Sequence, residues 1–213
     1  MAFLLALRRC ACPDALVFVD VTVAEHWAAE AFQVFQPRTY FNPTNNQAMG
    51  WSIPASLGGQ RACPGKCVAT LTGDGCFLMS SMEISTAARE GLPVKFFVLD
   101  DQAYHYMQEL QRPAYLRTTA TILARLDYAA LARGYGVQYQ EILATRDLDA
   151  GVRTALCTPG PVLIRVCTDY RKLHVRWIEC VRKKFSKELS FEQKMRFLAR
   201  IGSRALHFHK DND

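Results

Sequence analysis

The chain has 213 residues, half of them hydrophobic, and a formal net charge of +6 at pH 7. This length and apolar content predict one or at most two domains with a sizeable buried core. No apolar run approaches the ~18 residues that a membrane-spanning helix needs, which argues against a helical membrane protein. The opening stretch, MAFLLALRRCACP, carries its arginines after a short apolar run, whereas a secretory signal has the opposite order, so we expect no cleaved leader.

Short β-rich runs alternate with helix-like segments through the body of the chain. In chain order the expected elements are a strand at 15–20, helices at 24–35 and 51–62, a strand at 67–73, a helix at 77–91, a strand at 94–99, a helix at 127–136, a strand at 137–142, a helix at 147–156 and a strand at 160–167. This alternation predicts the α/β class, with an open parallel sheet that has helices on both faces.

The positive charge is concentrated after residue 170. Residues 171–213 contain twelve Lys or Arg and five Asp or Glu, a net charge of +7, so residues 1–170 carry −1. We therefore expect a lead-in at 1–14, the α/β domain at 15–170, and a basic tail of two amphipathic helices at 171–213. A solvated basic face packed on the body is favoured over contact with an anionic membrane or a nucleic acid, because the tail lacks interleaved aromatic residues.

Cysteines are scattered along the chain and several lie inside apolar runs. They are Cys10, Cys12, Cys63, Cys67, Cys76, Cys157, Cys167 and Cys180. A chain of this size does not need disulfide staples, so a reduced, intracellular protein is expected. The stretch CPGKC at 63–67 could be half of a metal clip, but no second Cys or His pair stands at finger-like spacing, and two thiols flanking a Pro-Gly turn are favoured.

Acidic residues follow two of the predicted strands. In TGDGCF (72–77) a strand runs into a Gly-Asp-Gly turn and a helix start, where Gly73 and Gly75 permit a close backbone approach and free N–H groups favour phosphate. Asp74 can reach a cation paired with that phosphate. Asp101 follows 27 residues later at the end of the next strand, so two carboxylates on neighbouring strand ends can share one metal ion. A purely structural turn is the alternative.

The pattern resembles the thiamine-diphosphate enzymes, specifically the acetolactate synthase and 2-oxoacid decarboxylase group. Their diphosphate-binding motif is Gly-Asp-Gly, an intervening stretch and Asn-Asn, and here the segment is GDGCFLMSSMEISTAAREGLPVKFFVLDD. Upstream, MGWSIPASLGGQ is similar to the family's Met-Gly-x-x-x-Pro-Ala-Ala-x-Gly segment. The resemblance covers roughly residues 15–170 and implies the C-terminal, diphosphate-binding domain of this family.

The resemblance implies thiamine diphosphate and Mg²⁺ as cofactors. It assigns the side chains of Asp74 and Asp101 and the main-chain carbonyl of Ala103 to magnesium. The residues that it places at the cofactor are Gln47, Met49, Gly73, Gly75, Cys76, Met79 and His105.

Most of these residues have an implied role. The N–H groups of Gly75 and Cys76 would face the diphosphate, and the carbonyl of Gln47 would face the 4′-amino group of the pyrimidine ring. Met49 would hold the two rings in their bent conformation, with Met79 near the thiazolium. Ordinary core packing is the alternative for both methionines.

The sequence departs from the family in two places. Asn-Asn has become Asp100-Asp101, and a glycine usually found a few residues later has become His105. Aspartate binds magnesium but adds a negative charge near a diphosphate, which the dication and a protonated His105 would offset.

The family's catalytic glutamate belongs to a separate pyrimidine-binding domain. Glu25, Glu83 and Glu90 do not map onto it, so no catalytic residue is assigned in this chain. We expect the C-terminal portion of a longer lyase, decarboxylase or carboligase acting on 2-oxo or 2-hydroxyacyl substrates, which is inactive by itself. A non-catalytic relative, either a pseudoenzyme or a truncated isoform, is the alternative. Expected partners are a small-molecule substrate and either a second copy or a pyrimidine-binding domain.

Overall fold

The structure is a computed structural model that describes residues 1–115, 117–170, 190–192, 195–196 and 198–199. The chain divides into two compact units. One consists of Met1–Ala103 and Leu123–Arg171, and the other of Tyr104–Ile122 and Lys172–Asp213. The tail helices expected at 171–213 lie largely outside the described residues. Within the described part of the tail, residues 191–192, 195–196 and 198–199 are helical.

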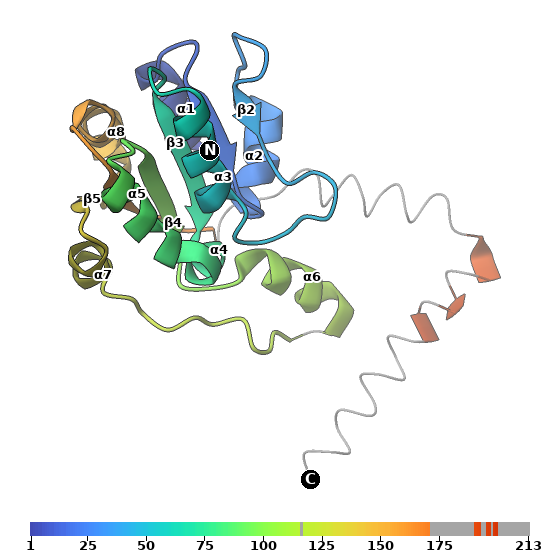
Figure 1. Cartoon of the computed structure of the whole chain (residues 1–213). Helices are drawn as coiled ribbons and strands as arrows, with labels where there is room; N and C mark the ends of the chain where they lie inside the picture. The colour runs from blue at the N-terminus through green and yellow to red at the C-terminus, as the bar shows by residue number, and fades with distance from the viewer. Residues whose placement is uncertain (116, 171–189, 193–194, 197, 200–213) are drawn as a thin grey trace. The chain divides into compact units, whose positions relative to one another are not determined.

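A parallel sheet forms the centre of the first unit (Figure 1). Within the described residues its six strands are β1 (Leu16–Val19), β2 (Tyr40–Phe41), β3 (Val68–Gly73), β4 (Lys95–Asp100), β5 (Gln138–Ile142) and β6 (Val162–Cys167). Their order in the sheet is β2-β1-β3-β4-β6-β5, and each neighbouring pair is parallel. The α/β fold class predicted from strand–helix alternation is thereby confirmed.

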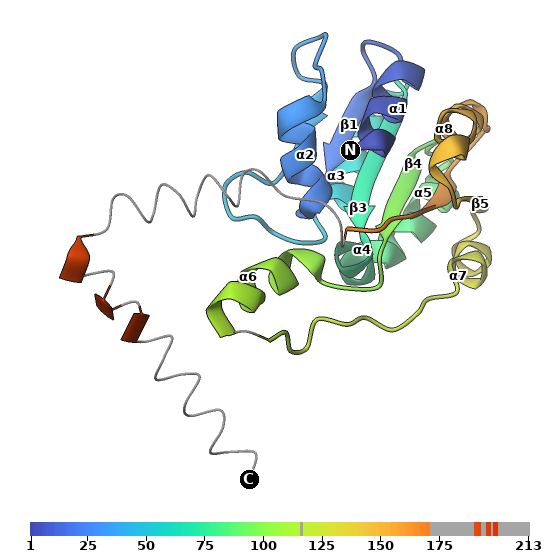
Figure 2. The ribbon, with the colours of Figure 1, turned by 180° about the vertical axis from the view of Figure 1, so that it is seen from behind.

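Helices cover both faces of this sheet. In this unit they are α1 (Ala2–Cys10), α2 (Val23–Ala31), α3 (Ser52–Ala62), α4 (Asp74–Ser80), α5 (Ile84–Glu90), α7 (Tyr128–Tyr135) and α8 (Leu148–Cys157), with short 3₁₀ turns at Ser81–Glu83 and Thr145–Asp147. One face packs against α3, α4, α5 and α7 through residues such as Ile53, Phe77, Ile84 and Ala132. Helices α1, α2 and α8 lie on the opposite face, which Figure 2 shows from behind.

Burial on both faces explains why the central strands are almost continuously apolar. Every residue of β3 and β4 is buried, and alternate side chains of β4 enter different layers. Phe96 and Val98 belong to the core beneath α3, α4 and α5. Phe97 points to the other layer, where its ring centroid lies 5.2 Å from that of Phe3 in α1. The sheet therefore separates two hydrophobic layers and contributes side chains to both.

Some expected elements differ from the observed ones. The helix expected at 77–91 is interrupted, because the chain passes through the 3₁₀ turn Ser81–Glu83 before it resumes as α5 and ends at Gly91 with φ +61°. The helix expected at 24–35 ends at Ala31, and Phe35 beyond it is 54% exposed. The prediction failed there because it treated every apolar residue as part of a buried helical face.

The second unit contains a helix that the sequence did not predict, α6 (His105–Tyr115). The chain after it folds back along the helix. The Tyr104 N–H donates to the Thr121 carbonyl at 2.8 Å, and Gln108 Nε2 donates to Thr121 Oγ1 at 3.2 Å. Within the described residues of both units, no helix is long and apolar enough to cross a membrane.

Candidate functional site

The acidic residues singled out by the sequence lie at the carboxyl ends of two adjacent strands. β3 ends at Gly73, directly before Asp74, and β4 ends at Asp100, directly before Asp101. The two strands pair in parallel, with Gly73 opposite Leu99. Ligands in open parallel sheets bind at this edge, so the topology places the predicted residues where a site is expected.

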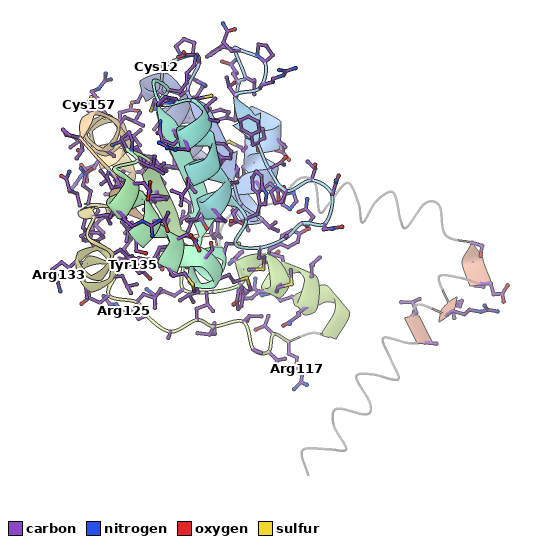
Figure 3. The ribbon with its side chains drawn as sticks, viewed as in Figure 1. Cys12, Arg117, Arg125, Arg133, Tyr135 and Cys157 are labelled. Carbon is purple, nitrogen blue, oxygen red and sulfur yellow. The ribbon has the colours of Figure 1, made fainter. Side chains whose placement is uncertain are left out.

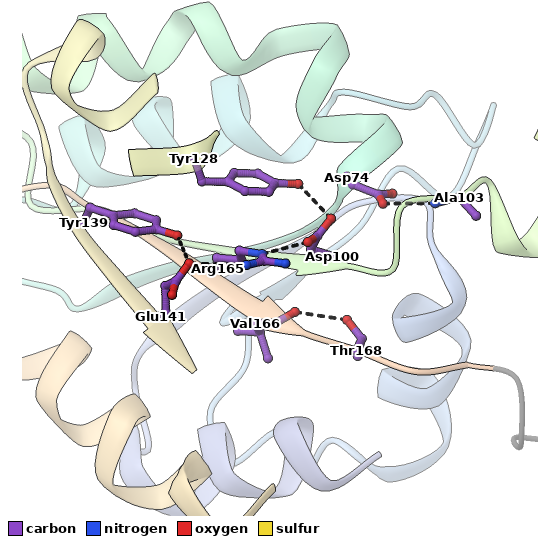
Figure 4. A network of polar contacts seen from close by, with 9 residues as sticks. All are labelled: Asp74, Asp100, Ala103, Tyr128, Tyr139, Glu141, Arg165, Val166 and Thr168. Atoms are coloured by element: carbon purple, nitrogen blue, oxygen red, sulfur yellow. Dashed lines mark hydrogen bonds and ion pairs between the residues drawn. The ribbon is translucent and has the colours of Figure 1, made fainter. Parts of the chain in front are cut away.

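Asp74 is a buried carboxyl group held by backbone amides. It is 4% exposed, and its Oδ1 accepts a hydrogen bond from the Gly75 N–H at 2.7 Å. Its Oδ2 accepts one from the Ala103 N–H at 3.2 Å, which Figure 4 shows. Burial, followed by the negative charge of Asp101, raises the pKa of Asp74 to about 7. A nearby cation would reverse this shift by favouring the ionised form.

The carboxylates of Asp74 and Asp101 and the Ala103 carbonyl are oxygen groups of the kind that magnesium prefers. The Ala103 amide contacts Asp74 directly, and the charge of Asp101 acts on the same carboxyl group. Among the described residues, no group of three or more His, Cys, Asp or Glu side chains is arranged to hold a metal ion. Two carboxylates and one carbonyl are nevertheless compatible with magnesium, because this ion usually completes its shell with phosphate oxygens and water.

The junction between β3 and α4 is tightly packed against the segment between β1 and α2. A Cβ atom at Gly73 would lie 3.1 Å from Thr22 Oγ1. Cys76, in the first turn of α4, is 2% exposed, and its thiol donates to the Val21 carbonyl at 3.0 Å. Burial raises the pKa of the Cys76 thiol, which therefore stays protonated. Cys76 can serve an anion through its backbone N–H, whereas its side chain has a packing role.

The two predicted cofactor segments meet at Gly50. This glycine has φ +81°, and a Cβ there would lie 2.9 Å from the Cβ of Met79. Gln47, three residues earlier, is exposed and has φ +50°, a left-handed conformation that is uncommon for a residue other than glycine. Met49 is half-buried and Met79 is 52% exposed. The loop that contains Gln47 and Met49 therefore adjoins α4 at Gly50.

Asp20 is a structural part of this site that the sequence analysis missed. It follows β1 and is fully buried. Its carboxylate accepts hydrogen bonds from the Gly50 N–H at 3.0 Å, the Ser52 N–H at 2.8 Å and the Ser52 hydroxyl at 2.7 Å. These bonds attach the loop before α3 to the end of β1. The available signal was the strand VFVD, which ends in an aspartate as VKFFVLDD does.

Glu25 of α2 supports the same loop from the other side. It is 3% exposed, and its Oε1 accepts hydrogen bonds from Asn42 Nδ2 at 3.0 Å and Gln47 Nε2 at 3.4 Å. Within the described part of the chain, the buried Oε2 atom has no hydrogen-bond partner. Burial raises the pKa of Glu25. The hydrogen bonds from Asn42 and Gln47 therefore connect α2 to the loop that contains Gln47.

Asp100 has different surroundings from Asp74, although both end a strand. Its Oδ2 lies 2.7 Å from Arg165 Nε of β6, and its Oδ1 accepts a hydrogen bond from the Tyr128 hydroxyl of α7 at 3.2 Å (Figure 4). Arg165 Nη1 also reaches Glu141 Oε1 of β5 at 3.3 Å. No sequence motif indicates these long-range contacts.

His105 belongs to the second unit, whereas Cys12 and Cys157 belong to the first. His105 begins α6 in the second unit, where its Nε2 is 3.8 Å from Glu109 Oε1. The described cysteines are free thiols. Cys12 and Cys157 lie toward the amino ends of the strands, at the opposite end of the sheet from Asp74 (Figure 3).

Comparison with known proteins agrees with this arrangement of motifs. Residues 20–166 match the family model described as thiamine pyrophosphate enzyme, C-terminal TPP binding domain, where thiamine pyrophosphate is another name for thiamine diphosphate. The chain belongs to this family. The matched range includes Asp20, Asp74 and Asp101, so the strand ends described above lie within the thiamine-diphosphate-binding domain.

Acetolactate synthases are among its relatives. The large subunit of acetolactate synthase isozyme 2 from Escherichia coli K12 is 31% identical over 160 residues, which cover 73% of this chain and 29% of that protein. Acetolactate synthase from Bacillus subtilis is 30% identical over 159 residues, 74% of this chain and 28% of its own length. The chain thus spans less than a third of the length of these relatives.

A solved structure gives the same result for the fold. The thiamine diphosphate-dependent 4-hydroxybenzoylformate decarboxylase of Rhodococcus jostii RHA1 superposes with a TM-score of 0.74 and 26% identity. The similarity covers 81% of this chain and 33% of the decarboxylase. The chain is therefore a domain related to both acetolactate synthases and a thiamine diphosphate-dependent decarboxylase.

Proposed function

We propose that this chain is the diphosphate- and magnesium-binding half of a thiamine-diphosphate-dependent lyase, decarboxylase or carboligase that acts on 2-oxo or 2-hydroxyacyl substrates. The observation that carries the proposal is the buried Asp74 carboxyl group, whose pKa is raised to about 7 beside Asp101 at the ligand-binding edge of the sheet. A bound dication would stabilise both carboxylates in their ionised form.

Magnesium is proposed to bind the side chains of Asp74 and Asp101 and the carbonyl of Ala103. Support comes from the oxygen-donor chemistry of this set and from the contact between the Ala103 amide and Asp74. The backbone N–H groups of Gly75 and Cys76 are proposed to bind the diphosphate. A glycine is favoured at position 73, where the phosphates are proposed to approach, because a Cβ atom there would lie 3.1 Å from Thr22 Oγ1.

The rings of the cofactor are proposed to lie against the loop that ends at Gly50. Met49 and Met79 would contact the rings, and the Gln47 carbonyl would accept a hydrogen bond from the 4′-amino group. When bound, thiamine diphosphate supplies the reactive carbon for cleavage or formation of a bond next to a carbonyl. The residues of this chain would hold and orient it.

Catalysis is proposed to need a pyrimidine-binding domain that donates a glutamate, supplied by another chain or by a longer form of this protein. Glu25, Glu83 and Glu90 are not proposed to replace it. The matching region covers less than a third of each acetolactate synthase named above, which is consistent with one domain of a larger enzyme. A homo-oligomer is also proposed, with the pyrimidine-binding domain supplied by the longer form of the protein.

Binding can be tested by thermal unfolding with Mg²⁺, with thiamine diphosphate and with both together. At ~100 times the dissociation constant, the ligands are expected to add about 2.7 kcal/mol to the free energy of unfolding. Asp74→Asn and Asp101→Asn should lose this gain. Asp149→Asn is the matched control, because Asp149 is 56% exposed in a surface ion pair.

Direct detection of the metal completes the test. Mn²⁺ replaces Mg²⁺ at oxygen sites, and its electron paramagnetic resonance signal distinguishes bound from free ion. Wild-type protein with thiamine diphosphate should bind Mn²⁺, whereas Asp74→Asn should not. The proposal is wrong if millimolar thiamine diphosphate with Mg²⁺ neither stabilises the wild-type protein nor promotes Mn²⁺ binding.

A non-catalytic relative with a structural or regulatory role is the second candidate. The changes that favour it are Asp100-Asp101 in place of Asn-Asn and His105 in place of glycine. Such a protein would show no carbon dioxide release from 2-oxo acids, even in its longest natural form with thiamine diphosphate bound. Turnover by that form would favour the enzyme.

A further inference from the structure

The Asp100 carboxylate is a buried charge one residue away from a proposed magnesium ligand. It is 5% exposed, and no water shell can stabilise its ionised form there. An ionised carboxylate in this position needs a partner that supplies positive charge and hydrogen-bond donors. Arg165 supplies both, since its Nε lies 2.7 Å from Asp100 Oδ2.

The parallel pairing of β4 and β6 makes this contact possible. Asp100 lies opposite Cys167, and Arg165 lies opposite Val98, two residues earlier on the same strand. Residues two apart in a strand share a face, so the side chains of Asp100 and Arg165 lie on the same side of the sheet. The Thr168 N–H donates to the Asp100 carbonyl at 3.0 Å and extends the pairing to the strand ends.

Further contacts fix both partners in place. The Tyr128 hydroxyl donates to the second oxygen of Asp100 at 3.2 Å, so both carboxylate oxygens face β6 and α7. Arg165 is 17% exposed; it also reaches Glu141 at 3.3 Å, and its guanidinium carbon lies 5.8 Å from the centre of the Tyr128 ring. This arrangement needs no cofactor to hold the arginine.

The neighbouring Asp74 has no such partner among its hydrogen bonds in the described structure. Its oxygens accept from the backbone amides of Gly75 and Ala103. The acidic residues at the two strand ends are therefore of two kinds. Asp100 is neutralised by a basic side chain, whereas the Asp74 carboxyl group is surrounded by neutral donors and is suited to a metal ion.

We propose that Arg165 is a positioning residue for the diphosphate and magnesium site. It neutralises Asp100 and holds that carboxylate against β6 and α7, so that the dication meets Asp74 and Asp101 while the diphosphate avoids a third negative charge. Arg165 thus compensates for aspartate in place of the first asparagine of the family motif. The inference rests on the proposed function, because it assigns Arg165 a role at that same site.

A double-mutant cycle tests the compensation. The dissociation constant of thiamine diphosphate at saturating Mg²⁺ is measured by calorimetry for wild type, Arg165→Met, Asp100→Asn and the double variant. Arg165→Met should weaken binding by about tenfold or more, a fold-change that corresponds to roughly 1.4 kcal/mol of coupling. The double variant should return to within about threefold of Asp100→Asn, because the uncompensated charge is gone.

Two further variants separate positioning from general stability. Glu141→Gln removes the charge of the other acidic partner of Arg165 but keeps an oxygen that can accept its hydrogen bond, so it should weaken cofactor binding less than Arg165→Met does. Arg165→Lys keeps the charge without the planar fork and should bind more tightly than Arg165→Met. The unfolding midpoint of each variant without cofactor is recorded, and if Arg165→Met does not fold, Arg165→Lys with and without Asp100→Asn takes its place in the cycle.

The outcomes are distinct. Wild-type affinity in Arg165→Met, or a double variant that binds no better than Arg165→Met, overturns the role of Arg165 and leaves the proposed function intact. Wild-type protein that binds neither Mg²⁺ nor thiamine diphosphate overturns both. Weakened binding by Arg165→Met with rescue by Asp100→Asn supports the compensation, since a purely structural role would change the unfolding midpoint without this pattern of affinity.

Discussion

Replacement of Asp20 by asparagine should destabilise the fold markedly while barely altering side-chain shape. One oxygen of the wild-type carboxylate serves the Val21 and Gly50 N–H groups, and the other serves the Ser52 N–H and hydroxyl groups. An asparagine amide places its NH₂ group against donors on one of these sides. At least one buried N–H then loses its acceptor, at about 1–3 kcal/mol, and charge-assisted bonds become neutral ones.

The expected loss is about 2–4 kcal/mol of a total stability of roughly 5–15 kcal/mol. Urea unfolding measures it as a lower midpoint at constant slope. Asp149→Asn is the control, because its ion pair with Arg9 at 2.7 Å is more than half exposed and should contribute only about 0–1 kcal/mol. If Asp20→Asn costs no more than this control, the carboxylate does not hold the Gly50 loop as argued.

Three smaller effects follow from other positions. Because burial raises the pKa of Glu25, its contribution to stability is complete below its ordinary pKa of 4.5 and is lost as pH rises through the raised value. The melting temperature of Glu25→Gln should therefore rise relative to wild type as pH increases from 4.5 toward neutrality; a constant difference would contradict this. Gly59→Ala should destabilise by about 1–3 kcal/mol because its Cβ would lie 2.4 Å from the Phe18 ring, whereas Gly58→Ala, with no atom within 4 Å, should stabilise by about 0.5–1 kcal/mol. Asp127→Ala removes the N-cap of α7 and should cost about 1 kcal/mol in chemical unfolding; an unchanged midpoint would show that the cap is dispensable.

The central strands were predictable because a parallel strand covered on both faces must be apolar along its whole length. The runs at 67–73 and 94–99 meet this condition, and the structure places β3 and β4 there. The proximity of the Gly-Asp-Gly turn to the Asp-Asp pair was predictable for a related reason. Each directly follows such a strand, so their proximity needs only the pairing of two consecutive strands in a parallel sheet.

Elements that depend on distant contacts were not predictable in this way. α1 consists of a short apolar run followed by arginines, and its burial depends on contacts such as that of Phe3 with Phe97, 94 residues later. β2 contains only Tyr40 and Phe41, and it exists as a strand through its pairing with Val17 and Phe18. Neither segment has the length or periodicity that marks a helix or strand locally.

The site also combines residues that a local motif identifies with residues that depend on distant contacts. Asp20 binds Gly50 and Ser52 across 30 and 32 residues, and Arg165 binds Asp100 across 65. The first contacts require the loop before α3 to return to the end of β1, and the second requires β4 and β6 to be neighbours, which alternation of elements does not determine. Motif reading therefore located groups that are proposed to bind the ligand, whereas the residues that support these groups became visible through the structure.

This difference changes how the Asp-Asp departure should be weighed. In the sequence, the two aspartates form one unit that brings an extra negative charge to a diphosphate site. In the structure, the Arg165 guanidinium lies 2.7 Å from the Asp100 carboxylate and opposes its charge, although Arg165 also contacts Glu141, and the Tyr128 hydroxyl donates to Asp100. Electrostatic repulsion from Asp100 is then a weak reason to regard the protein as non-catalytic. The argument for a non-catalytic relative rests instead on His105 and on the source of the pyrimidine-domain glutamate, which a turnover assay of the longest natural form addresses directly.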